Sequence, residues 1–164
     1  MALSGTARRR GAAAVSSSRQ LAALRGNTFG ALAMLIVQFA IGSVVNLYAT
    51  IPAKDKNSGI FGAIGGALAN GPVSLATHAG LGLLIVLAAA ALVVRSIVTR
   101  HTASIVLSVI GLTAIVSAAL NGARFVADGG PANASLAMAL STALAMLCYA
   151  TDLLLLGFSR PRSD

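Results

Sequence analysis

The chain has 164 residues, of which 57% are hydrophobic and 10% are charged, with a formal net charge of +8. In a soluble domain about a quarter of the residues are charged, and no soluble fold of this length could bury so much apolar surface. The composition therefore excludes a soluble globular domain. It also leaves little length for a catalytic domain outside a membrane.

The first 26 residues are rich in Arg, Ser and Ala and contain no acidic residue. This composition is typical of a disordered basic cytoplasmic tail that touches anionic lipid headgroups. An organellar transit peptide has the same composition, and this alternative stays open. We assign 1–26 to the tail, 27–159 to a transmembrane domain and 160–164 to a second short cytoplasmic tail.

Four uncharged, mostly apolar stretches fill the rest of the chain, and each can hold the roughly 20 apolar residues that a membrane-spanning helix needs. Prolines and glycines mark their limits. The sequence predicts an all-α polytopic membrane protein, an antiparallel bundle of four transmembrane helices. The predicted spans are 28–51, 73–95, 104–126 and 134–158.

The connections between spans differ in length. Between the first two spans lies an apolar segment, GIFGAIGGALANG at 59–71, which is too short to cross a bilayer. We predict that it forms a partial helix at the membrane interface and covers the outer mouth of the bundle. The turn between the second and third spans is short, so those two helices are expected to be antiparallel neighbours.

The basic residues predict the orientation. Nine of the 12 lie beside the starts of spans one and three or the ends of spans two and four, and the positive-inside rule makes that side cytoplasmic. We therefore predict N-in and C-in topology in a bacterial plasma membrane, with an organellar inner membrane as the alternative. This distribution also explains the net charge without a nucleic-acid partner. The nine are Arg8, Arg9, Arg10, Arg19, Arg25, Arg95, Arg100, Arg160 and Arg162.

Every span carries one stripe of polar or small residues at helical spacing, and polar groups are costly against lipid, so we expect the stripes to face the bundle interior. Helix packing explains them as well as a functional site does. The stripes are Gln38, Gly42 and Asn46; His78 and Gly82; Thr113, Ser117, Asn121 and Arg124; and Met138, Thr142, Ala145, Tyr149 and Asp152.

Two charged residues have alternative interpretations. Arg124 either reaches toward water or pairs with Asp128, or it holds an anionic group such as a haem propionate. Asp152 either caps a proton path or pairs with Arg95 or Arg100 at the same depth.

His78 stands out because Gly80 and Gly82 clear space beside its imidazole in the segment THAGLG. A haem needs a neutral imidazole, a flat slot and usually a second axial ligand from a facing helix. Met138 lies at a comparable depth in span four, whereas His101 lies at the opposite end of the bundle. The alternatives are a hydrogen-bonded structural histidine and a methionine that fills the core.

The segments LIVQFAIGSVV in span one and LATHAGLGLLIVL in span two resemble the first hairpin of one four-helix half of a haem A synthase. The resemblance covers mainly residues 30–95. It implies that His78 corresponds to the haem-ligand histidine of the second helix. Where the family has a second histidine, on the fourth helix, this chain has Met138, and its outer loop lacks the cysteine pair of many synthases.

We therefore predict a small membrane protein that binds haem b or serves as a subunit of a membrane redox complex. The alternative is a cofactor-free structural or assembly subunit; a small transporter is the weakest interpretation. The sequence contains no catalytic triad, phosphate loop or zinc cluster, which argues against an enzyme. Expected partners are the lipid bilayer and either further copies of the chain or other membrane subunits. The predicted cofactor-binding residues are His78, Met138, Gly82, Asn121 and Arg124, with His78 and Met138 as metal ligands.

Overall fold

The computed structural model describes residues 3–51 and 59–158, with side chains from residue 18 onward. Within these ranges the regular secondary structure is α-helical, as the sequence predicts. The helices are α1 (Leu3–Tyr48), α2 (Gly59–Asn70), α3 (Val73–Thr99), α4 (Thr102–Ala127) and α5 (Ala132–Phe158).

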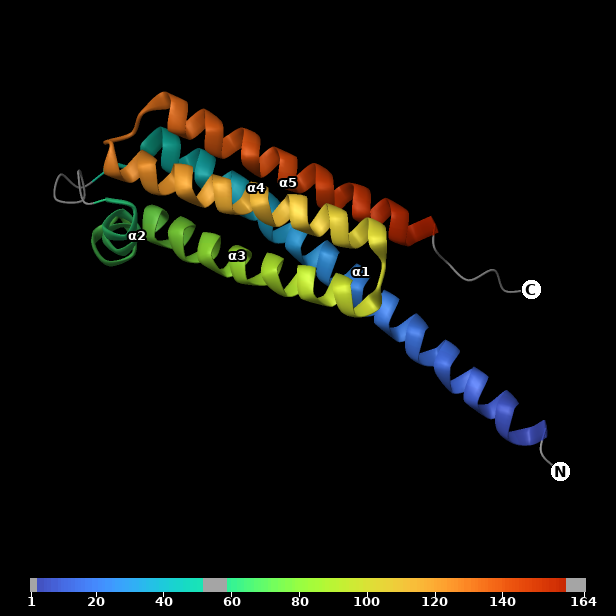
Figure 1. Cartoon of the computed structure of the whole chain (residues 1–164). Coiled ribbons are helices and arrows are strands. Elements are labelled where there is room, and N and C mark those ends of the chain that lie inside the picture. The colour runs from blue at the N-terminus through green and yellow to red at the C-terminus, as the bar shows by residue number, and fades with distance from the viewer. Residues whose placement is uncertain (1–2, 52–58, 159–164) are drawn as a thin grey trace.

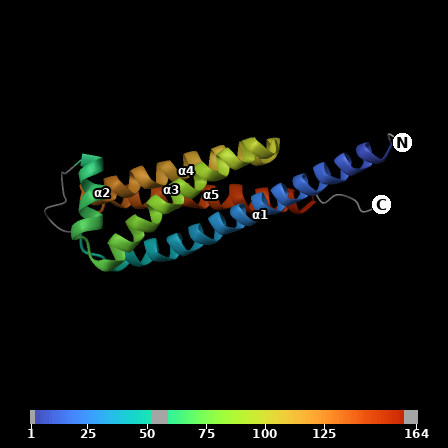
Figure 2. The same ribbon diagram turned by 90° about the horizontal axis from the view of Figure 1, so that it is seen from below.

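The four long helices lie side by side and α2 lies across one end of them (Figures 1 and 2). Each long helix contacts two others in the order α1, α3, α4, α5 and back to α1, while α2 packs on α3 and α4. We call the end that carries α2 and the α4–α5 connection the loop end. The end that carries the α3–α4 connection is the terminal end, and α1 projects beyond it (Figure 1).

The predicted spans match the long helices, with small differences at their ends. α3 continues to Thr99 because no breaker precedes Arg100, which ends the helix in the left-handed conformation with φ 55°. Its backbone N–H donates to the Ile97 carbonyl oxygen at 3.0 Å. α4 follows at once, and His101 caps it by accepting a hydrogen bond from the Ser104 backbone N–H.

The start of α1 differs from the prediction of a disordered tail over residues 1–26. In the structure the helix begins at Leu3 and continues without interruption to Tyr48. The segment is rich in alanine, arginine and leucine, which have high helix propensity, and it contains no proline. The basic segment is therefore helical and extends the first span beyond the bundle.

The short helix predicted in the long connection is present as α2. Ala63, Gly66 and Ala67 are buried against the bundle. Because these residues are small, α2 can lie close to α3 and α4 and cover the loop end.

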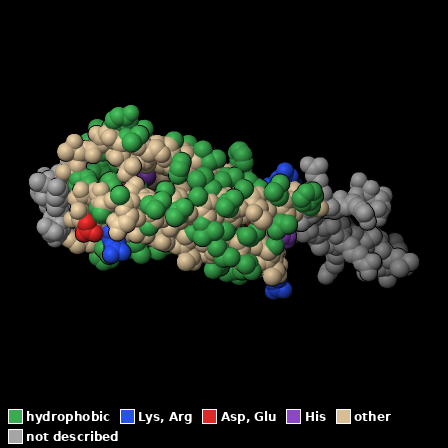
Figure 3. Space-filling view, turned by 90° about the horizontal axis from the view of Figure 1, so that it is seen from above, with side chains coloured by type: hydrophobic (Ala, Val, Ile, Leu, Met, Phe, Trp, Pro, Cys, Tyr) green, Lys and Arg blue, Asp and Glu red, His purple; other side chains and the backbone are tan. Residues whose placement is uncertain are grey.

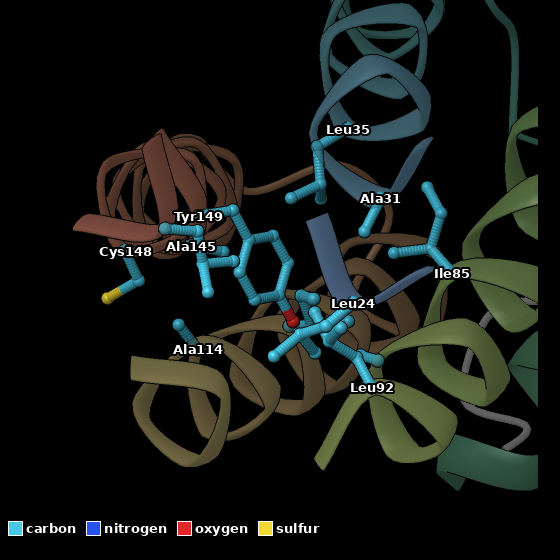
Figure 4. Close-up of a cluster of buried hydrophobic side chains, with 12 residues drawn as sticks. Leu24, Ala31, Leu35, Ile85, Leu92, Ala114, Ala145, Cys148 and Tyr149 are labelled. Carbon is cyan, nitrogen blue, oxygen red and sulfur yellow. The ribbon is translucent and has the colours of Figure 1, made fainter. Parts of the chain in front are cut away.

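Tyr149 fills the centre of the largest cluster of buried side chains, in the half of the bundle nearer the terminal end. Its ring reaches from α5 toward α4, α1 and α3, and its hydroxyl points toward Leu24 and Leu92 (Figure 4). A Cβ at Gly111 on α4 would lie 2.7 Å from Tyr149 Cε1. The absence of a side chain at Gly111 therefore gives the ring its place.

The outside of the bundle is apolar. Leu47, Leu87 and Leu147 are 70%, 68% and 67% exposed. Figure 3 shows hydrophobic side chains over the middle of one face and charged side chains at its two ends. Such a belt is stable against lipid and costly in water.

Four helices are long and apolar enough to cross a membrane: Ser18–Tyr48, Val73–Thr99, Thr102–Ala127 and Ala132–Phe158. Together with the apolar exterior they identify a small multi-pass integral membrane protein.

The contact between Gly111 and Tyr149 predicts a difference between two glycine substitutions. Gly111→Ala should lower the free energy of unfolding in detergent by about 1–3 kcal/mol, because the added methyl group overpacks the core. Gly30→Ala in α1 is the control, since its Cβ would meet nothing within 4 Å. It should be neutral or stabilising. Thermal unfolding measures both, and equal stabilities would contradict the packing argument.

Candidate functional site

His78 lies on α3 with its imidazole against the backbone of α1. A Cβ at Gly42 would lie 2.8 Å from His78 Cε1, so the glycine makes room for the ring. The Gln38 amide nitrogen donates to the His78 carbonyl oxygen at 2.9 Å and lies 3.4 Å from His78 Nε2. The histidine is therefore hydrogen-bonded to α1, as expected for a structural role.

Two buried polar atoms of this pair have no hydrogen-bond partner, His78 Nδ1 and Gln38 Oε1. The contact with Gln38 makes Nε2 an acceptor when the imidazole proton lies on Nδ1. In that tautomer the pair holds one unused donor, Nδ1–H, and one unused acceptor, Oε1. A buried polar atom without a partner costs about 1–3 kcal/mol, so a polar ligand that reached these atoms would be stabilised.

A cavity of about 230 Å³ lies beside the pair in the loop-end half of the bundle. All five helices contribute to its walls, and Ala63 and Ala67 of α2 lie over it. The walls are mainly apolar. The polar side chains that line it are Gln38, Ser43, Asn46, His78, Ser135 and Thr142.

The cavity is open along α1. Phe39, Ser43 and Asn46 follow one another on this helix, line the cavity and are exposed. Figure 3 shows a hollow near the loop end of the bundle with histidine atoms at its bottom. Ser135 of α5 donates to Asn46 Oδ1 at 2.8 Å and ties the two helices together at the loop end. The opening therefore faces sideways between α1 and α5, toward the lipid.

The structure brings three of the predicted site residues together. His78, Gly82 and Met138 line the same cavity. A Cβ at Gly82 would lie 3.1 Å from the Gln38 amide nitrogen, and a Cβ at Gly122 of α4 would lie 3.3 Å from the Met138 sulfur. These glycines thus make room for side chains of the protein itself.

Asn121 and Arg124 lie elsewhere. They line a separate shallow hollow with Ile60 of α2. Thr113 and Arg124 are exposed, so the prediction that this stripe faces the bundle interior is wrong for these two residues. Ile115, Ala118 and Gly122 of α4 line the cavity instead. The Asn121 amide donates to the Ser117 carbonyl oxygen at 2.8 Å, a bond within its own helix.

The residues present do not fit a porphyrin as the helices stand. The places beside Gly42, Gly82 and Gly122 are filled by His78, Gln38 and Met138. The cavity volume lies below the roughly 300–1,000 Å³ of pockets for drug-sized ligands.

The pairing of Gln38 with His78 is the part of the site that sequence reasoning missed. The signal was present, because Gln38 and Gly42 share one face of their helix at the depth of the THAGLG segment. Comparison of the chain with protein-family models, curated proteins and solved structures finds no match. The resemblance to a haem A synthase half therefore stays a prediction.

The position of the His78 ring against Gly42 predicts how a methyl group at Gly42 would act. Gly42→Ala should displace the ring from α1, so that diethylpyrocarbonate modifies His78 several-fold faster. Mass spectrometry measures the modification, with His101 as the internal reference. Gly26→Ala, which meets nothing within 4 Å, should leave the rate unchanged. Equal rates in both variants would show that Gly42 does not hold the ring.

Proposed function

We propose that the four spans run antiparallel with both termini in the cytoplasm of a bacterial cell. Of the basic residues whose side chains the structure describes, Arg19, Arg25, Arg95 and Arg100 belong to the terminal end, and Arg124 belongs to the loop end. The positive-inside rule then assigns the terminal end to the cytoplasm and α2 to the outer surface.

Cysteine labelling tests this orientation in a Cys148→Ala background. Asp128→Cys at the loop end should react with a membrane-impermeant maleimide in intact cells. Arg19→Cys at the terminal end should react only after the cells are permeabilised. Both native residues are exposed, so access to the reagent depends on the side of the membrane. The reverse labelling pattern would overturn the topology.

We further propose that the chain binds a small membrane-soluble ligand in the cavity beside His78. The observation that carries this function is the pair of unused polar atoms, His78 Nδ1 and Gln38 Oε1, on two side chains that line the cavity. A ligand reaches Oε1 when the Gln38 side chain turns toward the cavity, and it reaches Nδ1 when the imidazole turns toward the cavity. The sideways opening lets a lipophilic molecule enter from the bilayer.

The chemistry of the cavity favours a ring-sized head that carries oxygen atoms, as in a quinone and its quinol. A quinone carbonyl oxygen accepts from Nδ1–H, and a quinol hydroxyl donates to Oε1. Both forms therefore find a partner in this pair. The apolar tail of such a molecule would leave past Phe39 between α1 and α5.

A binding measurement with a short-tailed benzoquinol tests the proposal. We expect His78→Leu and Gln38→Leu each to weaken binding roughly fivefold to tenfold, because a neutral hydrogen bond contributes about 1 kcal/mol. Thr113→Val is the matched control; Thr113 is exposed and bonds only the Val109 carbonyl oxygen of its own helix. Equal binding by all three variants would refute the site.

Haem b is the second candidate, favoured by one observation. His78 and Met138 line one cavity from α3 and α5, which occupy opposite corners of the ring of helices. Binding would require the helices to separate. An absorbance spectrum of protein expressed with added haem should then show a Soret band that His78→Ala abolishes. If the protein is colourless, haem binding is excluded, and the remaining candidate functions are binding of a quinone-type ligand and a cofactor-free subunit.

Association with further copies or with other membrane subunits is part of the proposal. It is supported by α1, whose N-terminal part projects beyond the bundle without a neighbouring helix (Figures 1 and 2). Native mass measurement in a mild detergent distinguishes a homo-oligomer from a mixed complex.

A further inference from the structure

Asp152 of α5 is fully buried in the terminal-end half of the bundle. One carboxyl oxygen lies 3.1 Å from the Thr28 hydroxyl of α1, and the other lies 2.5 Å from the Ser104 hydroxyl of α4. Among the described residues no ion pair joins Asp152 to an arginine, so the predicted pairing with Arg95 or Arg100 is wrong. Two buried hydroxyl groups hold the carboxyl group instead.

A continuous chain of hydrogen bonds leads from this carboxyl group to the surface. Ser104 is fully buried, and its hydroxyl lies 2.9 Å from Nδ1 of His101. His101 is partly exposed in the two-residue connection between α3 and α4. The chain Asp152, Ser104, His101 therefore links the bundle interior with the aqueous side of the terminal end.

The two hydroxyl groups that contact Asp152 have fewer hydrogen atoms than acceptors around them, so the chain has room for one more proton. The Thr28 hydroxyl faces two acceptors, the Leu24 carbonyl oxygen and Asp152, with one proton for both. The Ser104 hydroxyl likewise lies between Asp152 and His101 Nδ1. A protonated Asp152 can supply the missing hydrogen.

We propose that Asp152 is a proton-loading site that exchanges its proton with water through Ser104 and His101. In the loaded state the Asp152 O–H donates to Ser104 Oγ, and the Ser104 O–H donates to His101 Nδ1. On release, the Asp152 proton passes to Ser104 Oγ while the Ser104 proton passes to His101 Nδ1. The carboxylate then accepts from Ser104, and His101 gives up a proton from Nε2 to water.

The groups around Asp152 on each element are consistent with this path. On α5, Tyr149 lies one turn deeper, and its buried hydroxyl has no partner. Cys148 precedes it and is also buried. On α3, the Arg95 guanidinium is held 3.2 Å from the Asn27 side-chain oxygen when that amide is oriented to accept. His101 is thus the titratable group to which the carboxyl group is connected.

Infrared difference spectroscopy on the full chain in liposomes tests the loading site. Acid-minus-neutral spectra should contain a carboxylic acid C=O band that shifts in D₂O. Asp152→Asn should remove the band, while Asp128→Asn, at an exposed acid of the loop end, should keep it. A wild-type spectrum without a band assignable to Asp152 would overturn the proposal.

A second experiment tests the relay through Ser104 and His101. It measures how fast the carboxylic acid C=O band changes after a pH jump. Ser104→Ala should slow the change on the order of 100-fold, as expected when a positioned proton carrier is lost. Ser104→Thr should restore the rate because it keeps the hydroxyl. His101→Asn should also slow it while preserving the α4 N-cap, which guards against loss of the fold. Wild-type rates in both Ser104→Ala and His101→Asn would refute the relay.

Discussion

The exclusion of water from the hydrocarbon of a bilayer is the constraint on which this structure depends. A polar side chain placed on a membrane-spanning helix must find its partner on the same helix or on a neighbour. The contacts between helices follow this requirement. Gln38 joins α1 to α3, Ser135 joins α5 to Asn46 of α1, and Asp152 joins α5 to α1 and α4. These few polar contacts supply specificity that apolar surfaces alone would not.

Glycine residues determine where side chains cross between helices. Gly111 admits the Tyr149 ring, Gly42 admits His78, and Gly122 lies against the Met138 sulfur. In each case the missing Cβ allows a side chain from the neighbouring helix to approach the backbone. The small residues that indicate a slot for a flat cofactor in the sequence are, in the structure, in contact with side chains of the protein itself.

The two halves of the bundle differ in packing, and this difference separates the two proposed functions. The terminal-end half is filled by Tyr149 and its apolar neighbours, with Asp152 beside them. The loop-end half holds the cavity, which α2 covers and which opens along α1. The two proposals therefore place ligand entry from the lipid in the loop-end half and proton exchange with water at the terminal end.

Local properties of the sequence determined the four spans, the short helix α2 and the common depth of His78 and Met138. Hydropathy and helix-breaking residues are properties of the local sequence, so these features do not depend on which helices are neighbours in space. The tertiary structure alone decided which face of each helix points inward. It turned Thr113 and Arg124 outward and gave Asp152 the hydroxyl partners Thr28 and Ser104. The physical reason is that a helix apolar on all sides has little amphipathic moment, so packing against its neighbours sets its rotation.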